Sequence, residues 1–191
     1  MVLPSSAEQT AGRIERLRKF RETYEIPLDK KAADALHYAL LFADADAKLC
    51  RRLMQSLKPS RDELSAAETV QKYGNATETF ADKPLDYAVK LLMKAGGDDF
   101  PKRIALYRQA LGTMDDVTTQ AVIHTAEELR EAGACVRLAE LAVTGEDLMP
   151  LGFAGPALGK TLNALLDRVM RGELANEREI LLNAAEKERN G

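Results

Sequence analysis

Apolar side chains recur every three or four residues along most of this chain, which is the spacing of amphipathic α-helices. In one example, Leu85, Ala88, Val89 and Leu92 fall on a single helical face. The same periodicity predicts helices over about residues 5–26, 29–42, 48–57, 60–74, 84–96, 99–112, 115–132 and 135–142, with two more opening near 155 and 176. Alternation of period two is nearly absent, so strands are not expected.

Start and stop signals support these helices. Ser60 is followed three residues later by Glu63, which is the spacing of a capping box at a helix start. Pro27 ends the first helix, and Pro84 occupies a position suited to a first helical turn. We therefore expect an all-α fold, an irregular bundle of about nine helices.

The bundle is expected to contain two helical units. The loosest stretch, residues 74–83, is rich in Asn, Thr, Ala and Asp and has the composition of a hinge. It divides the chain into units of residues 1–78 and 79–191. No repeat with the period of a helical solenoid is evident, so an irregular bundle is favoured over an array.

Composition narrows the class of protein. The hydrophobic fraction of 46% is sufficient for a core, and the formal net charge of −3 argues against a uniformly basic nucleic-acid binder. Cys50 and Cys135 are far apart, which predicts neither a zinc site nor a disulfide framework. The N-terminus lacks a signal-peptide pattern and no apolar run is long enough to span a membrane, so we expect a soluble, cytoplasmic protein with no membrane partner.

Catalytic and metal-binding patterns are weak. Asp44 and Asp46 form a D-x-D pair, but two carboxylates two residues apart share a face only on a strand, and this pair lies at a helix junction. We interpret one of them as an N-cap of the next helix. His37 and His124 are isolated on expected helices, so no metal site and no catalytic residue is predicted.

Basic residues gather in three places, where they could contact phosphates or form solvated helix faces. The first cluster is Arg13, Arg16, Arg18, Lys19 and Arg21; the second is Lys48, Arg51, Arg52, Lys58 and Arg61; the third is Lys160, Arg168 and Arg171. The second cluster contains no acidic residue between its members until Asp62.

Gly155 and Pro156 open the helix that carries the third cluster. Proline at the first helical position costs no hydrogen bond, and the N–H groups just beyond it suit a phosphate oxygen. Gly159 lacks a side chain, which allows the close approach of either another helix or an RNA backbone. The helix–helix contact is slightly favoured.

Four short motifs follow one another near the C-terminus. They are Gly145-Glu-Asp-Leu, Gly155-Pro-Ala-Leu-Gly, Leu165-Leu-Asp-Arg-Val and Gly172-Glu-Leu-Ala-Asn. In this order they resemble the tail of bacterial CCA-adding tRNA nucleotidyltransferases, relatives of poly(A) polymerase. The resemblance is strongest over residues 99–182, and it implies that this chain corresponds to part of the neck, the body and the tail of such an enzyme.

The resemblance implies a role in gripping tRNA. The catalytic head of the family does not appear in these residues, so Mg²⁺ and nucleotide would belong to that head and this chain alone would not be an enzyme. Within the tail motifs, Asp147 is expected to cap the turn after it and Asn176 the last helix. Lys160 and Arg168 are the expected phosphate contacts.

A different class of function is also open. The chain could be a helical interaction or dimerisation module with no RNA role, which would self-associate through exposed apolar side chains. The candidates for that surface are Leu148, Met149, Leu151 and Phe153.

Overall fold

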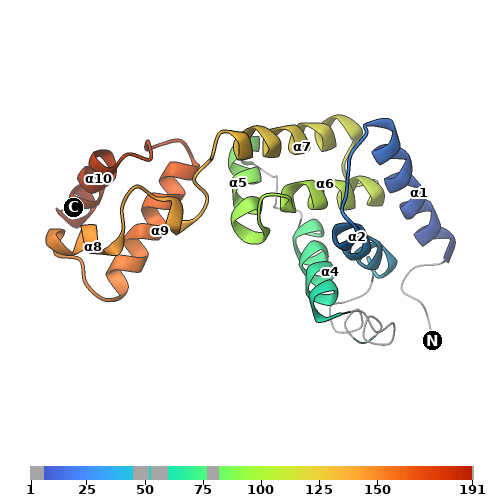
Figure 1. Ribbon diagram of the computed structural model, residues 1–191, viewed down its shortest axis with the longest axis horizontal. Helices are drawn as coiled ribbons and strands as arrows, with labels where there is room; N and C mark the ends of the chain where they lie inside the picture. Colours follow the sequence, from blue (N-terminus) through green and yellow to red (C-terminus); the bar gives the residue numbers. More distant parts are fainter. Residues whose placement is uncertain (1–6, 45–51, 53–59, 77–81, 191) are drawn as a thin grey trace.

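The computed structural model describes residues 7–44, 52, 60–76 and 82–190. Within these ranges the chain forms α-helices, short 3₁₀ turns and loops, with no strand, so the expected all-α fold is confirmed (Figure 1). The helices are α1 (Ala7–Thr23), α2 (Lys30–Leu41), α4 (Arg61–Gly74), α5 (Leu85–Gly96), α6 (Phe100–Leu111), α7 (Asp116–Glu131), α8 (Gly145–Leu148), α9 (Pro156–Met170) and α10 (Arg178–Asn190), with 3₁₀ turns η2 (Leu138–Glu140) and η3 (Met149–Leu151).

Local signals place the helix ends. The expected capping box of α4 is present, because the Glu63 N–H donates to the Ser60 hydroxyl at 3.2 Å and the Ser60 N–H donates to the Glu63 carboxylate at 2.7 Å. Asp115 caps α7 by accepting the Thr118 N–H at 2.8 Å. The helix expected over residues 48–57 lies outside the described residues, apart from Arg52.

A first hydrophobic cluster holds the N-terminal two thirds of the molecule together. Helix α6 lies at its centre and packs against α1, α2, α4, α5 and α7. The reason is that α6 has apolar residues around most of its circumference, and Phe100, Ile104 and Tyr107 are all fully buried. Gly74 at the end of α4 lies directly against the Tyr107 ring, where a side chain would have no room.

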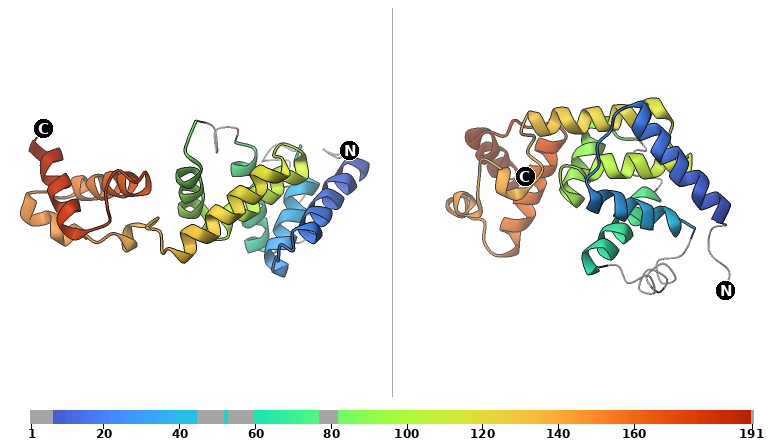
Figure 2. Two further views of the ribbon diagram at one scale, coloured as in Figure 1. Left: turned by 90° about the horizontal axis from the view of Figure 1, so that it is seen from above. Right: turned by 45° about the vertical axis from the view of Figure 1, so that its right-hand side comes forward.

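A second, smaller cluster holds the tail unit, which we define as residues 137–190. It joins α8, η3, α9 and α10 through side chains such as Leu148, Leu165 and Leu181. Seen from above, the tail unit lies beyond α5, and the segment after α7 leads into it (Figure 2). One side chain from outside the unit, Tyr87 of α5, belongs to this cluster.

The first cluster runs from Leu17 to Val136 and so includes helices from both sides of the expected boundary between residues 78 and 79. That boundary stays a prediction. Among the described residues, no helix is both long enough and apolar enough to cross a membrane.

The prediction of a helix over residues 135–142 is wrong. That segment is an irregular stretch containing only the 3₁₀ turn η2. The Glu140 carboxylate accepts the N–H groups of Val136 and Arg137, at 2.8 and 2.9 Å, and so satisfies backbone donors without a regular helix.

Candidate nucleic-acid interface

Helix α8 is held at its start by Asp147. The N–H and the hydroxyl of Thr144 both donate to its carboxylate, at 2.7 and 3.0 Å, and Arg178 of α10 forms an ion pair with it at 2.6 Å. The Thr144 N–H and then the Arg178 guanidinium lower the pKa of Asp147 below its ordinary value. Asp147 therefore stabilises the start of its own helix and links it to α10. The expectation that it caps the following turn is wrong.

Asn176 also differs from its expected role. Helix α10 begins two residues later, at Arg178. The Asn176 amide accepts the Ala142 N–H at 2.9 Å and donates to the Glu140 carbonyl at 2.8 Å. An amide side chain offers both a donor and an acceptor, so here it pairs with an irregular backbone segment instead of capping a helix.

The start of α9 follows the Gly-Pro signal. Gly155 has φ 53° and ψ −133°, a conformation that favours glycine, and Pro156 occupies the first helical position. The next two N–H groups, of Ala157 and Leu158, donate to the carbonyls of Ala154 and Gly155, both at 3.2 Å. Two of the donors expected to suit a phosphate oxygen are therefore already bonded within the turn.

Gly159 faces solvent on the first turns of α9. A Cβ atom added there would meet nothing within 4 Å, so no described segment packs closely against it. The favoured explanation, a tight helix–helix contact, is thus not seen in the described part of the chain. The surface beside Gly159 is instead open to a ligand.

The three cations of the third basic cluster differ in their partners. Lys160 is exposed, and it has no ion pair within the described ranges. Arg168 lies 3.6 Å from Glu173 and 3.4 Å from Glu188. Arg171 pairs with Asp167 at 2.8 Å. At ~100° per residue Lys160 and Arg171 lie within ~20° of each other around the helix axis, with Arg168 on an adjacent strip.

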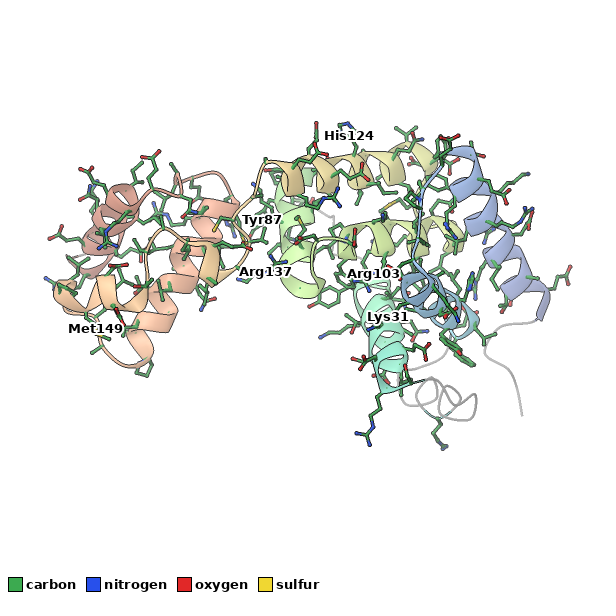
Figure 3. The ribbon with its side chains drawn as sticks, viewed as in Figure 1. Lys31, Tyr87, Arg103, His124, Arg137 and Met149 are labelled. Atoms are coloured by element: carbon green, nitrogen blue, oxygen red, sulfur yellow. The ribbon has the colours of Figure 1, made fainter. Side chains whose placement is uncertain are left out.

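Tyr87 connects α5 to this surface (Figure 3). Its hydroxyl donates to Asp167 at 2.5 Å, and the Arg171 guanidinium lies 4.7 Å from the centre of its ring. Partial burial acts to raise the pKa of Asp167, but the Tyr87 hydroxyl and Arg171 outweigh it, so the pKa is lowered. Burial, followed by the Asp167 carboxylate, raises the pKa of Tyr87.

Two further bonds attach the tail unit to the helices before it. Lys90 of α5 donates to the Met170 carbonyl at the end of α9, at 3.0 Å, where a cation also suits the helix dipole. Arg137 pairs with Asp98 at 2.7 Å. Together with the Tyr87 contacts, these bonds form what we call the α5 junction.

Sequence reasoning missed the α5 junction. A signal for it exists, because α5 has apolar residues on opposite faces: Tyr87 and Leu91 on one, Val89 and Met93 on the other. The second face packs into the first cluster, while Tyr87 and Leu91 meet the second. Two apolar faces predict a helix that is packed on both sides.

The first basic cluster is used mainly within the fold. Arg13 pairs with Asp44 at 3.0 Å, Arg16 donates to the Ala110 carbonyl at 2.8 Å, and Arg18 pairs with two glutamates of its own helix. Arg21 donates to the Ile26 carbonyl at 3.2 Å. Four of the five cations in this cluster are therefore already bonded, whereas Lys19 is exposed.

The second basic cluster lies largely outside the described residues, including Arg51. Arg52 and Arg61 are exposed. Asp44, half of the D-x-D pair, is an ion-pair partner of Arg13, and Asp46 is not described. Among the described residues, no three His, Cys, Asp or Glu side chains gather closely enough to hold a metal ion.

The apolar surface expected for self-association is mostly buried. Leu148 is fully buried, and Leu151 and Phe153 pack against the second cluster. Met149, with 56% of its surface exposed, is the exception. The expectation of an exposed patch is wrong for the other three, because their side chains pack in the second cluster with those of α9 and α10.

Comparison with known proteins agrees with the motifs of the tail unit. A family model described as "tRNA nucleotidyltransferase domain 2 putative" matches residues 30–185. The chain belongs to this family. A protein named CCA-adding enzyme, from Limosilactobacillus fermentum (strain NBRC 3956 / LMG 18251), is 35% identical over 95 residues, which are 49% of this chain and 22% of that enzyme. No solved structure was found to match.

Proposed function

We propose that this chain is the tRNA-binding part of a CCA-adding type of tRNA nucleotidyltransferase. The observation that carries the proposal is the family match over residues 30–185, which includes residues of both hydrophobic clusters. The name of the relative favours CCA addition over poly(A) addition. The proposed compartment is the cytoplasm.

The face of α9 that begins at Lys160 is the proposed phosphate contact. Lys160 and the open surface at Gly159 are accessible without rearrangement. Arg168 and Arg171 reach RNA by exchanging a carboxylate for a phosphate, so each contributes less net affinity than Lys160. Gly155 sets the direction of the helix. Arg51, which lies outside the described residues, and Arg52 are proposed as a second contact.

Nucleotide addition is assigned to a catalytic part of such an enzyme that these residues do not supply. We propose that Mg²⁺ and the nucleotide are bound there. The role of this chain is then to hold the RNA in position, which raises the effective concentration of its end at the catalytic site.

Binding of tRNA to Lys160→Glu and Arg168→Glu variants tests the proposal. We expect both reversals to weaken binding, with Lys160→Glu the stronger, and removal of one phosphate contact to lower the slope of log K against log salt by about 1. Fluorescence anisotropy over a series of salt concentrations measures both quantities.

Lys30→Glu provides the matched control. It makes the same change in net charge at an exposed lysine of α2, outside the three basic clusters and away from α9 (Figure 1). Equal binding of wild type and both α9 variants would refute the α9 assignment. Binding of heparin as tight as that of tRNA would refute a tRNA-specific role.

A further inference from the structure

A groove of about 750 Å³ lies between α7 and the connection from α1 to α2. Ile26 and Ile123 line it and are almost fully buried, and Ala121 is partly exposed. The other lining residues include the exposed Tyr24, Pro27, Gln120 and His124. Figure 3 shows His124 on the outer side of α7, away from α6. The volume is within the range of binding sites, and apolar side chains lie at the bottom of the groove.

The α1–α2 side of the groove is held in one conformation. The Tyr24 ring, with 38% of its residue surface exposed, packs on Phe20 with ring centroids 4.6 Å apart. The Arg21 guanidinium donates to the Ile26 carbonyl at 3.2 Å, and the Ile26 N–H donates to the Arg21 carbonyl at 3.0 Å. These bonds enclose Glu25, whose φ of 51° is uncommon for a residue with a side chain. Such a preformed surface loses little conformational entropy when it binds a ligand.

The groove is acidic. Glu25 and Glu127 line it, both are exposed, and neither forms an ion pair with another described residue. Among the described residues that line it there is no lysine or arginine, and His124 lies 3.3 Å from the carboxylate of Glu128. A negative surface attracts cations and repels phosphate. The groove is therefore separate in its chemistry from the proposed RNA surface, and the α1–α2 connection also lies at the end of the molecule away from α9 (Figure 1).

We propose that this groove binds a segment of a partner protein that presents an arginine beside an apolar side chain. The guanidinium lies against the Tyr24 ring and donates to Glu25 or Glu127, while the apolar side chain covers Ile26 and Ile123. Arginine fits better than lysine, because its planar group stacks on an aromatic ring and pairs with carboxylates through two N–H groups. This inference is independent of the proposed RNA-binding function.

Three blocked tripeptides test the groove in titrations of the isotope-labelled chain followed by NMR. Acetyl-Leu-Arg-Leu-amide carries the cation and the apolar groups, acetyl-Gly-Arg-Gly-amide carries the cation alone, and acetyl-Leu-Glu-Leu-amide has the opposite charge. We expect the first peptide to shift the signals of Tyr24, Ile26 and Ala121. The other two should bind more weakly, because each lacks one of the two features that match the groove.

Variants of the groove give the size of each contribution. Tyr24→Leu should weaken binding of acetyl-Leu-Arg-Leu-amide about two- to fivefold, the effect of losing one exposed cation–π contact. Glu127→Gln should weaken it by a similar factor, the effect of losing one exposed ion pair. Glu186→Gln makes the same change in charge at an exposed position of α10 and should leave the binding unchanged.

Several outcomes would overturn the proposal. Acetyl-Leu-Arg-Leu-amide could leave the signals of Tyr24, Ile26 and Ala121 unchanged, or Tyr24→Leu and Glu127→Gln could bind it like wild type. Equal shifts with acetyl-Gly-Arg-Gly-amide or with spermidine would show that the groove attracts any small cation. The same shifts with tRNA would assign the groove to the RNA surface instead.

The result is distinguishable from that for the proposed function. Lys160→Glu should leave binding of acetyl-Leu-Arg-Leu-amide unchanged, since Lys160 does not line the groove. If the peptide binds but tRNA does not, the groove is supported and the RNA function fails. If tRNA binds through Lys160 and the peptide does not bind, the groove is refuted and the RNA function is unaffected.

Discussion

The two hydrophobic clusters differ in how they are built. The first has α6 at its centre, and side chains of α1, α2, α4, α5 and α7 pack around the buried side chains of α6. The second draws on α9, α10 and short turns, and it includes Tyr87 of α5 as a contribution from outside. A small core buries less apolar area for each ordered residue, so it depends more on its attachments. The α5 junction is therefore expected to govern the stability of the tail unit.

The same difference concerns function. The proposed phosphate contacts lie on the exposed surface of α9, a helix that belongs to the smaller cluster. Ligands that contact both sides of the junction would stabilise the docked arrangement, since binding to one state favours that state. The comparison thus predicts that the helices of the first cluster are stable and that the tail unit, which is proposed to bind RNA, is less stable.

The largest expected loss of stability comes from a matched pair of substitutions that shorten a core side chain. Leu106 of α6 and Leu165 of α9 are both fully buried, so replacing either with alanine should cost about 2–5 kcal/mol. Leu106→Ala should lower protection from hydrogen exchange throughout the molecule. Leu165→Ala should lower it mainly in α9 and α10, because the first cluster does not depend on this side chain.

Hydrogen exchange followed by mass spectrometry resolves the two patterns, with the retention of helical circular dichroism as a control for folding. Equal loss of protection in α6 and α9 after Leu165→Ala would show that the clusters unfold as one unit, and the proposed contrast would be wrong.

A second pair compares two tyrosine hydroxyls. Tyr87→Phe removes a hydrogen bond to the Asp167 carboxylate, and Tyr107→Phe removes one to the neutral Asn75 amide at 3.2 Å. Hydrogen bonds to charged groups contribute more to stability than bonds to neutral groups. We therefore expect Tyr87→Phe to lower the free energy of unfolding by about 1–2 kcal/mol and Tyr107→Phe by about 0.5 kcal/mol. The loss in Tyr87→Phe should appear as faster exchange in the tail unit. Faster exchange confined to α6 would contradict the role given to the junction.

Local sequence signals predicted the helices well and the long-range contacts poorly. Ser60 and Glu63 lie three residues apart, and their capping box depends only on nearby backbone. Leu36 and Leu40 are buried as their spacing on one face indicates. Asn176, in contrast, bonds to Glu140 and Ala142, more than thirty residues earlier, and no local pattern specifies such partners.

The candidate site shows the same limit. The basic residues of α1 and of α9 have similar spacing, yet Arg16 is committed to the Ala110 carbonyl of another helix while Lys160 is exposed. Which cations are accessible is decided by tertiary packing, so sequence could nominate clusters but could not rank them.

The smallest expected effect is a dependence of tail docking on pH. The folded-state pKa of Asp167 is below its ordinary value of 3.8, because the Tyr87 hydroxyl and Arg171 favour the carboxylate more than partial burial disfavours it. The folded state therefore binds this proton less readily than the unfolded state. The resulting stabilisation is complete above the unfolded pKa and is lost as pH falls through the lower folded value.

Carbon-13 shifts of the Asp167 carboxyl should accordingly show a midpoint below pH 3.8. Tyr87→Phe should move the midpoint upward, since it removes one of the groups that favour the charged form. Asp147 is also stabilised as a carboxylate, and its titration in the same samples provides an internal control that Tyr87→Phe should leave unchanged. A wild-type midpoint for Asp167 at or above the ordinary value would show that burial outweighs the groups that favour its carboxylate, and the α5 junction would then lose its electrostatic component.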